Sequence, residues 1–488
     1  MVVGLRMSRA RVEDRGSQRV ISWGQEMYQQ AADMAQNTAV IEVDTTIDEG
    51  RWTSFQTVTV LICGVVTLID GFDAQSIGFV APVLAKQWGV APAAFGPVFS
   101  ASLVGMMIGA LSLGPIADRF GRKVAAILAI AFMGIFTLAS AKCTSVESLM
   151  VVRLLTGIGL GGALPNCVAL SGEYAPARWR ATAIGAMFCG FPLGAMLGGL
   201  LAARIIPAFG WESVFYIGGS IPLILIPILA AIMPESIRYL VVRRKEPKRI
   251  LNLLHKIAPE IPATESSKFV VRENTSGGVA ISELFSHGRL LRTLMLWVSV
   301  FANLLLYYFL INWLPLLLQQ AGLSLSNAIL LTALLNFGGI VGTIVFARSL
   351  DRAGNSRILI WAFLGCTVFT VLLGYAGANV PVLVFAVFLA GFCANGALNN
   401  LSAVAANLYP TNVRATGIGW ALGFGRVGSI TGPMIGTWLL VAKVELAHLF
   451  TIIALPSLFA AVAMYVLNMR RSESGTDRVA DAARTVDV

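Results

Sequence analysis

Residues 157–185 have the sequence GIGLGGALPNCVALSGEYAPARWRATAIG, and residues 391–419 have the sequence GFCANGALNNLSAVAANLYPTNVRATGIG. The two stretches align without a gap at a shift of 234 positions (391 − 157), with twelve identities in twenty-nine positions. A second pair lies one residue out of this register, GPIADRFGRK at 114–123 and ARSLDRAGNS at 347–356. Because two motifs repeat in the same order, we predict two parallel halves with one ancestor rather than a chance similarity between Gly-rich segments.

Long apolar stretches fill both halves. The 488 residues are 56% hydrophobic and 13% charged, which is about half the charged fraction of a soluble globular protein. A helix needs ~20 mostly apolar residues to cross a bilayer. Twelve such stretches are predicted, at 57–83, 93–114, 123–142, 147–170, 182–206, 213–233, 293–318, 325–347, 358–376, 380–408, 415–440 and 446–467. We therefore expect an all-α membrane protein with twelve transmembrane helices in two pseudo-symmetric six-helix bundles.

Polar segments divide this pattern into domains. Residues 1–55 are expected to be a disordered cytoplasmic extension, followed by a first six-helix bundle at 56–235. Residues 236–292, which are rich in charge, are predicted to be a cytoplasmic linker with short amphipathic helices. A second bundle at 293–468 and a cytoplasmic tail at 469–488 complete the predicted organisation.

Lysine and arginine are distributed unevenly over these segments. If both termini are cytoplasmic, the cytoplasmic segments hold 30 of the 36 Lys and Arg, the outer segments hold 4, and two residues, Arg153 and Arg426, lie within helices. The positive-inside rule therefore predicts that both termini lie in the cytoplasm. The net charge of +10 is explained by this topology and by contact with anionic lipid headgroups, without a nucleic-acid partner.

The cysteines and histidines show no spacing typical of a metal site. The six cysteines lie in or beside apolar helices, and the three histidines lie in loops or at a helix end. We predict neither a metal nor a cofactor.

The stretch GPIADRFGRK at 114–123 matches the pattern G-x-[IL]-A-D-R-x-G-R-[KR]. It resembles the loop between helices two and three of the major facilitator superfamily. Within that superfamily, DGFD at 70–73 followed by Gly78 and Ala81-Pro82 is similar to the aromatic acid:proton symporter family, with which Gly425-Arg426-x-Gly428 agrees. The resemblance implies a carrier, not an enzyme, in a bacterial cytoplasmic membrane, and we expect it to be a monomer. It would import a benzoate-like or hydroxybenzoate-like acid with protons by alternating access.

Two acids lie on one face of the first predicted helix. Asp70 lies some 13 residues into it, or ~20 Å at 1.5 Å per residue, and Asp73 follows one turn later. Two carboxylates in a desolvated site, with Gly71 leaving room between them, cannot both be ionised cheaply, so at least one is suited to bind and release a proton. The alternative is that Asp73 is solvated near the outer mouth and Asp70 caps a kinked helix.

Two arginines accompany these acids at membrane depth. Arg426 is expected to hold the substrate carboxylate, because its planar fork suits bidentate binding. A salt bridge within the protein is the alternative for Arg426. Arg153 is expected to pair with Asp70 or Asp73 and so contribute to proton coupling, or else to extend to the outer surface.

Aromatic and amide side chains accompany the charges. Aromatic rings with a polar tip, together with amides, suit a cavity that binds a flat, partly polar solute. The predicted substrate-binding residues besides Arg426 are Asn166, Tyr307, Tyr308, Asn312, Asn395 and Asn399. Trp297 and Trp313 near helix ends are equally well explained as anchors at the membrane interface.

A set of charges near the inner surface is assigned by the resemblance to an inner gate. In the superfamily the acid at the position of Asp118 forms a charge relay with arginines and helix ends, and the second-half copy is expected to be weaker because Asn355 replaces an arginine. The gate residues that this implies are Asp118, Arg119, Arg122, Glu173, Arg180, Asp351, Arg352 and Arg414.

Other functions remain open at this point. A carrier for sugars, aliphatic acids or drugs, in symport or antiport, has the same architecture. A membrane-embedded enzyme or receptor is the alternative from another class. An enzyme of that kind needs a nucleophile, metal cluster or phosphate-binding loop at depth, and the sequence shows none.

Overall fold

The computed structural model of the chain comprises two compact units. It describes residues 40–486 apart from 244–246, 262, 265–266, 273–280, 287, 354–356 and 411–412, and it describes only the backbone of 351, 353, 406–407, 415 and 470–486. The small unit consists of the described parts of Met1–Thr57, Glu173–Arg180 and Glu235–Glu273. The helical unit consists of those of Val58–Gly172, Ala181–Pro234 and Asn274–Val488.

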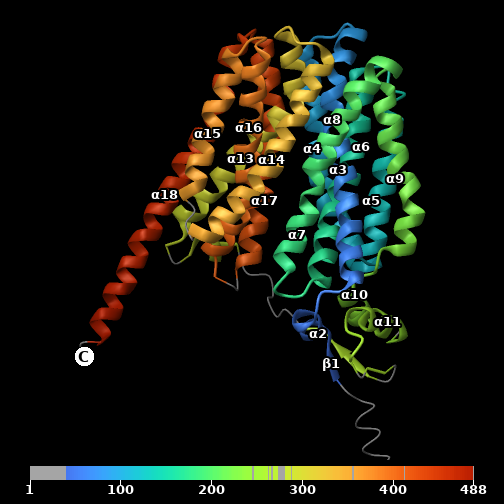
Figure 1. Cartoon of the computed structure of the whole chain (residues 1–488), viewed down its shortest axis with the longest axis vertical. Coiled ribbons are helices and arrows are strands. Elements are labelled where there is room, and N and C mark those ends of the chain that lie inside the picture. The colour runs from blue at the N-terminus through green and yellow to red at the C-terminus, as the bar shows by residue number, and fades with distance from the viewer. Residues whose placement is uncertain are drawn as a thin grey trace, which may run out of the picture. The chain divides into compact units, whose positions relative to one another are not determined.

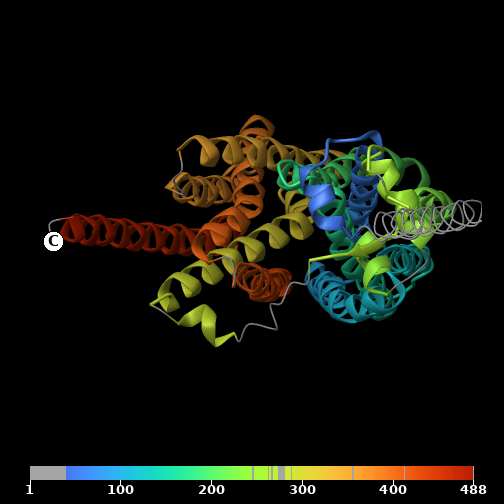
Figure 2. The ribbon, with the colours of Figure 1, turned by 90° about the horizontal axis from the view of Figure 1, so that it is seen from below.

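Twelve helical spans occur among the described residues, in two groups of six (Figures 1 and 2). The first group contains α3 (Ser54–Gln87), the turn η1 (Pro92–Ala94) with α4 (Phe95–Phe120), α5 (Arg122–Ser140), α6 (Val146–Tyr174), α7 (Arg180–Phe188) with α8 (Gly190–Phe209), and α9 (Glu212–Ile232). The second contains α13 (Leu290–Gln320), preceded by α12 (Ser282–Phe285), and then α14 (Leu325–Ala353), α15 (Arg357–Tyr375), α16 (Val380–Leu408), α17 (Arg414–Val441) and α18 (Leu446–Val486). Each predicted apolar stretch coincides with one span, and the predicted fold class is confirmed.

Eleven of the spans in the described part of the chain are long and apolar enough to cross a membrane. The remaining span, α17, is not among these eleven, and it contains many glycines and Arg426. A charged residue and small residues in a spanning helix are typical of a segment that faces a neighbouring helix or a polar cavity rather than lipid.

Glycines permit close helix contacts in both bundles. A Cβ atom on Gly105 of α4 would lie 2.1 Å from the Leu154 carbonyl oxygen of α6, and one on Gly338 of α14 would lie 2.1 Å from the Phe388 oxygen of α16. Gly71 of α3 packs in the same way against α8, with 1.9 Å between its added Cβ and the Phe191 oxygen. The expectation that Gly71 leaves room between two acids is therefore corrected: its small size is needed for the contact of α3 with α8.

This contact gives a direct test. Replacing Gly71 with Ala is expected to lower the stability of the protein by about 1–3 kcal/mol, because the new methyl group overlaps backbone atoms that cannot move independently. Thermal unfolding in detergent measures the change. Gly64→Ala in the same helix is the matched control, since its Cβ would have no neighbour within 4 Å and Ala favours helix. Equal unfolding temperatures for the two variants would contradict the packing argument.

The two bundles contact each other in the half of the helical unit that contains η1. We call this half the η1 end, and we call the opposite half, which contains Gly121, the Gly121 end. Trp313 of α13 lies fully buried there, edge-on to Phe99 of α4 at 5.1 Å between ring centroids, and its indole N–H donates to the Pro433 carbonyl oxygen (3.1 Å). Trp313 is therefore a contact between bundles and not an interface anchor. Four hydrogen bonds between described residues also join the bundles: Ser100 to Ile430 O (2.9 Å), Thr437 to Ala93 O (3.2 Å), Ser326 to Ala203 O (3.0 Å) and Asn336 to Gln75 Oε1 (2.8 Å).

The small unit is built from three separate parts of the chain. Strand β1 (Val40–Glu42) pairs in parallel with β2 (Lys268–Val270), and α2 (Val43–Glu49), α10 (Ile237–Val242) and α11 (Pro247–Ile257) complete it. Asp44 is 7% exposed and accepts from the Arg238 side chain and from the Arg272 backbone N–H, both at 2.8 Å. Arg180 pairs with Asp48.

This unit corrects the predicted disorder of residues 1–55. Residues 40–55 form β1, α2 and the first turn of α3, because Val43 and Ile47 are apolar and buried and Asp44 has basic partners. The predicted disorder of residues 1–39 lies outside the described residues. The short helices that were predicted for the linker are α10, α11 and α12.

Candidate functional site

A group of ionisable side chains is buried within the helical unit. Asp70 and Asp73 of α3 are 1% and 0% exposed, and Arg153 of α6 is 1% exposed. The alternatives of a solvated Asp73 and a surface-directed Arg153 therefore do not hold in this structure. Burial of a charge is costly unless hydrogen bonds and an opposite charge compensate it, so the partners of each group decide what it can do.

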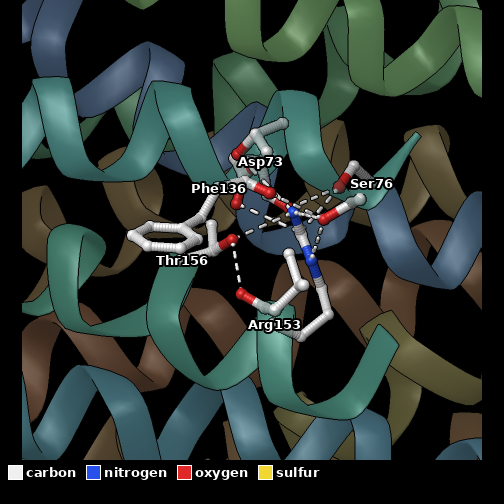
Figure 3. A network of polar contacts seen from close by, with 8 residues as sticks. Asp73, Ser76, Phe136, Arg153 and Thr156 are labelled. Atoms are coloured by element: carbon white, nitrogen blue, oxygen red, sulfur yellow. Dashed lines mark hydrogen bonds and ion pairs between the residues drawn. The ribbon is translucent and has the colours of Figure 1, made fainter. Parts of the chain in front are cut away.

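Asp73 and Arg153 form a compensated pair (Figure 3). Arg153 Nη1 lies 3.3 Å from Asp73 Oδ2, and the Thr137 hydroxyl of α5 donates to Asp73 Oδ1 at 2.5 Å. Arg153 Nη2 donates to Ser140 Oγ at 2.8 Å, and the guanidinium carbon lies 5.0 Å from the centre of the Phe215 ring. Helices α3, α5, α6 and α9 thus all contribute to one ion pair.

Asp70 has no such compensation. Both of its carboxylate oxygens are buried, and neither accepts a hydrogen bond from a described residue. Asp73 and Arg426 are the charged groups that act on it. An ionised carboxylate without a donor is costly at membrane depth. Asp70 is therefore the acid of the two that is better suited to carry a proton.

Arg426 of α17 is the cation of the second bundle nearest this group. Its side chain is partly exposed, and none of the ion pairs among the described residues includes it. The Tyr308 hydroxyl of α13 lies beside the guanidinium, within reach of a side-chain hydrogen bond. The internal salt bridge considered from the sequence is thus not formed with any described residue, and the guanidinium of Arg426 is available for an anion.

A small cavity lies between the first bundle and α13. It has room for about one water molecule. Tyr308 and Asn312 border it from α13, and the first bundle supplies Ala74, Ile77, Phe99, Ser102, Leu103, Met106 and Leu160. Tyr308 thus lies beside both Arg426 and the cavity.

The remaining predicted binding residues are distributed more widely. Tyr307 contacts the Tyr308 ring edge-on, at 5.7 Å between ring centroids, and its hydroxyl donates to Asn336 Oδ1 at 3.2 Å, in the contact between the bundles. Asn166 and Asn395 are buried and each leaves one amide atom, Oδ1 and Nδ2 respectively, without a described partner. Asn399 is exposed and donates to Thr343 Oγ1 at 3.0 Å.

The predicted inner-gate residues lie at or near helix ends. Asp118 is largely exposed and pairs with Arg122 at 3.1 Å, and Arg119 lies over the Phe120 ring. Glu173 accepts from Ser236 in the small unit, to which Arg180 also belongs. Arg352 is exposed, Arg414 donates to the Tyr409 carbonyl oxygen, and the side chain of Asp351 lies outside the described residues.

Residues that the sequence did not single out complete the site. Gln75 links α3 to Asn336, and Thr137, Ser140 and Ser102 contact the ion pair or the cavity. A usable signal was the one-turn spacing of small polar residues such as Thr137 and Ser140 inside otherwise apolar helices.

Comparisons with known proteins agree with this architecture. The model of the Major Facilitator Superfamily matches residues 63–376 and 330–486. The 4-hydroxybenzoate transporter PcaK of Acinetobacter baylyi is 37% identical over 440 residues, which are 90% of this chain and 96% of that one. The gallate transporter of Pseudomonas putida is 42% identical over 427 residues, which are 87% and 95% of the two chains.

A solved structure has the same fold. The xylose transporter XylE from Escherichia coli, in a partially occluded inward-open conformation, aligns with a TM-score of 0.66 over 85% of this chain and 98% of that one, at 19% identity. The relatives are named as transporters and not as enzymes. On the family model, the identities and the twelve spans, this chain belongs to the Major Facilitator Superfamily.

Proposed function

We propose that this protein imports an aromatic carboxylate together with protons by alternating access. The observation that carries the proposal is that Arg426 and Asp70 lie near each other at membrane depth. Among the described residues, Arg426 has no ion-pair partner and Asp70 has no hydrogen-bond donor. The names of the relatives, which transport 4-hydroxybenzoate and gallate, support an aromatic acid as the solute.

Each group has a distinct role in this proposal. Arg426 binds the substrate carboxylate and Tyr308 orients it, while Asp70 carries the proton. Asp73 pairs with Arg153 and accepts a hydrogen bond from Thr137, so it serves to hold α3 in place. With the substrate anion on Arg426 and the proton on Asp70, the site has no uncompensated charge, so the barrier to moving one bundle against the other is lowered.

The direction of transport depends on which end of the helical unit faces the cytoplasm. In the proposal the η1 end faces outward and the Gly121 end faces the cytoplasm of a bacterium, as the positive-inside distribution favours. Contacts such as Ser100 with Ile430 then close the outer side in this conformation and separate when the carrier opens outward. The inner-gate charges, Asp118 with Arg119 and Arg122 among them, are proposed to close the opposite side in that second state.

Purified protein in liposomes tests the function. Labelled benzoate or 4-hydroxybenzoate is offered outside at a pH one unit below the interior, with protein-free vesicles as the control for passive entry of the neutral acid. Uptake above that control, abolished by a protonophore, is the expected result. Faster uptake of an aliphatic dicarboxylate or a sugar would support another carrier, and no accumulation of any of these solutes would contradict the proposal.

The Asp70→Asn variant tests the proton-binding role. One proton moving down a one-unit pH difference supports about tenfold accumulation, since tenfold corresponds to ~1.4 kcal/mol. The asparagine cannot release a proton, so we expect the accumulation ratio to fall to that of exchange without a driving force. Glu445→Gln, which alters an exposed carboxylate, should accumulate like the wild type. An Asp70→Asn protein that still concentrates its substrate by about tenfold would assign the proton elsewhere.

A further inference from the structure

The hydrogen bond between Gln75 and Asn336 differs from the three others that join the bundles in the described part of the chain. In those three, a side-chain hydroxyl donates to a backbone carbonyl oxygen. Here two side-chain amides meet, with 2.8 Å between Asn336 Nδ2 and Gln75 Oε1. Gln75 is 1% exposed and Asn336 is 0% exposed. A side-chain bond that is shielded from water in this way depends on the orientation of both amides.

Tyr307 orients the Asn336 amide from within the second bundle. The Tyr307 hydroxyl donates to Asn336 Oδ1 at 3.2 Å, and Asn336 Nδ2 donates to the Thr332 carbonyl oxygen at 3.1 Å as well as to Gln75. The amide oxygen can only accept and the amide nitrogen can only donate, so these partners fix which side of Asn336 faces Gln75. The Tyr307 hydroxyl therefore acts on the contact between the bundles through Asn336.

The amide of Gln75 is only half satisfied. Its Oε1 accepts from Asn336, whereas its Nε2 is buried and has no hydrogen-bond partner among the described residues. A buried donor without a partner costs free energy, and water could supply that partner if the bundles separated at the η1 end. One hydrogen bond thus favours the closed contact and one unpaired donor disfavours it, which leaves the two close to balance.

These three side chains lie next to both groups of the proposed site. The Tyr307 ring contacts the Tyr308 ring edge-on, at 5.7 Å between ring centroids, and the Tyr308 hydroxyl lies beside Arg426. Gln75 follows Asp73 by two residues on α3. A small movement of α13 or α3 at the site therefore reaches the Asn336 amide directly.

We propose that Gln75, Asn336 and Tyr307 form a latch that sets how readily the η1 end opens, with Tyr307 as its positioning residue. The role belongs to the alternating access of the proposed function, on which it rests. When the η1 end is open, water replaces the bonds among the three side chains. When it is closed, removal of one latch group leaves its neighbour buried and unpaired. Such a change therefore moves the equilibrium toward the open arrangement.

The distance between two spin labels at the η1 end measures this equilibrium. Labels are attached to the full chain in detergent micelles after Lys142→Cys and Glu445→Cys, which alter exposed residues in the loops after α5 and after α17, one in each bundle. The native cysteines are buried or half-buried, so labelling favours the introduced pair. Double electron–electron resonance then gives the ratio of molecules with the longer distance, which are open, to molecules with the shorter distance.

The Tyr307→Phe variant is the sharpest test, because it removes one oxygen atom and no hydrogen bond between the bundles. We expect the ratio of open to closed molecules to rise about fivefold, as the loss of one hydrogen bond predicts. Asn336→Leu should raise it at least as much, since both neighbours lose a partner. Ser457→Ala is the matched control: its buried hydroxyl donates to the Phe363 carbonyl oxygen at 2.9 Å within the second bundle, so the ratio should stay unchanged.

The outcomes separate the latch from the transport function. The double variant Tyr307→Phe with Asn336→Leu should match Asn336→Leu, because both changes act through one amide. An unchanged ratio in Tyr307→Phe, or an equal rise in Ser457→Ala, would overturn the latch alone. One fixed distance in the wild type and in every variant would overturn both the latch and alternating access. The expected shifts in a chain that accumulates no aromatic acid in liposomes would support the latch and overturn the proposed function.

Discussion

Replacing Arg426 with Gln is expected to weaken the binding of an aromatic carboxylate by about 100-fold. The guanidinium has no ion-pair partner among the described residues, so its charge is available to the substrate. Removing one member of a desolvated charge pair costs roughly 2–5 kcal/mol, and each 1.4 kcal/mol is a factor of about ten. The half-saturation concentration for uptake in liposomes measures the loss.

Arg426→Lys shows whether the loss of affinity comes from the bidentate geometry of the guanidinium or from its positive charge, and Arg204→Gln is the control. Arg426→Lys keeps the charge but cannot bind a carboxylate bidentately, so its affinity should lie between those of the wild type and of Arg426→Gln. Arg204→Gln, which alters an exposed arginine of α8, should behave like the wild type. An Arg426→Gln protein with normal affinity would place the substrate carboxylate elsewhere.

The helical architecture is predictable because its signals are local. Each span needs about twenty apolar residues within one stretch of chain, and the repeat at 157–185 and 391–419 shows that the two halves share one plan. The small unit could not be predicted in this way, because it depends on contacts between distant parts of the chain. Val40 pairs with Lys268, across more than 200 residues, and a short strand of three residues has no periodicity that could reveal such a partner.

The candidate site shows the same division. A charge deep within a membrane span is costly and usually has a functional role. Depth therefore identifies the candidate residues, which are Asp70, Asp73, Arg153 and Arg426. It does not say which acid pairs with Arg153, since both acids lie on one face of α3. The decision comes from α5, where Thr137 donates to Asp73 and not to Asp70, and the position of α5 beside α3 is a property of the tertiary structure.

Neighbouring aromatic residues give a further example. Tyr307 and Tyr308 are adjacent on α13, and although their rings touch edge-on, their hydroxyl groups have different partners. Sequence reasoning assigned both to the substrate. The structure directs Tyr308 to Arg426 and the cavity, and Tyr307 to Asn336 in the contact between the bundles. Composition can indicate a polar aromatic helix, but the rotation of that helix is fixed by its neighbours.

Replacing Arg153 with Leu is expected to destabilise the protein by about 3–5 kcal/mol, the cost of leaving one charge of a buried pair without its partner. Asp73 would keep the Thr137 hydroxyl but lose the guanidinium, and Ser140 would lose its donor. Equilibrium unfolding in mixed detergent micelles measures the free energy difference. Arg204→Leu is the matched control, because that side chain is exposed.

The double variant Arg153→Leu with Asp73→Asn distinguishes a lost ion pair from a lost packing contact. Removal of both charges leaves no uncompensated group, so most of the stability should return, although the cation–π contact with Phe215 is still absent. Recovered stability with lost proton-driven accumulation would mean that the pair itself titrates during transport. Recovered stability with accumulation that still depends on Asp70 is the expected result, because Asp73 and Arg153 then serve to hold α3 in place while Asp70 exchanges the proton.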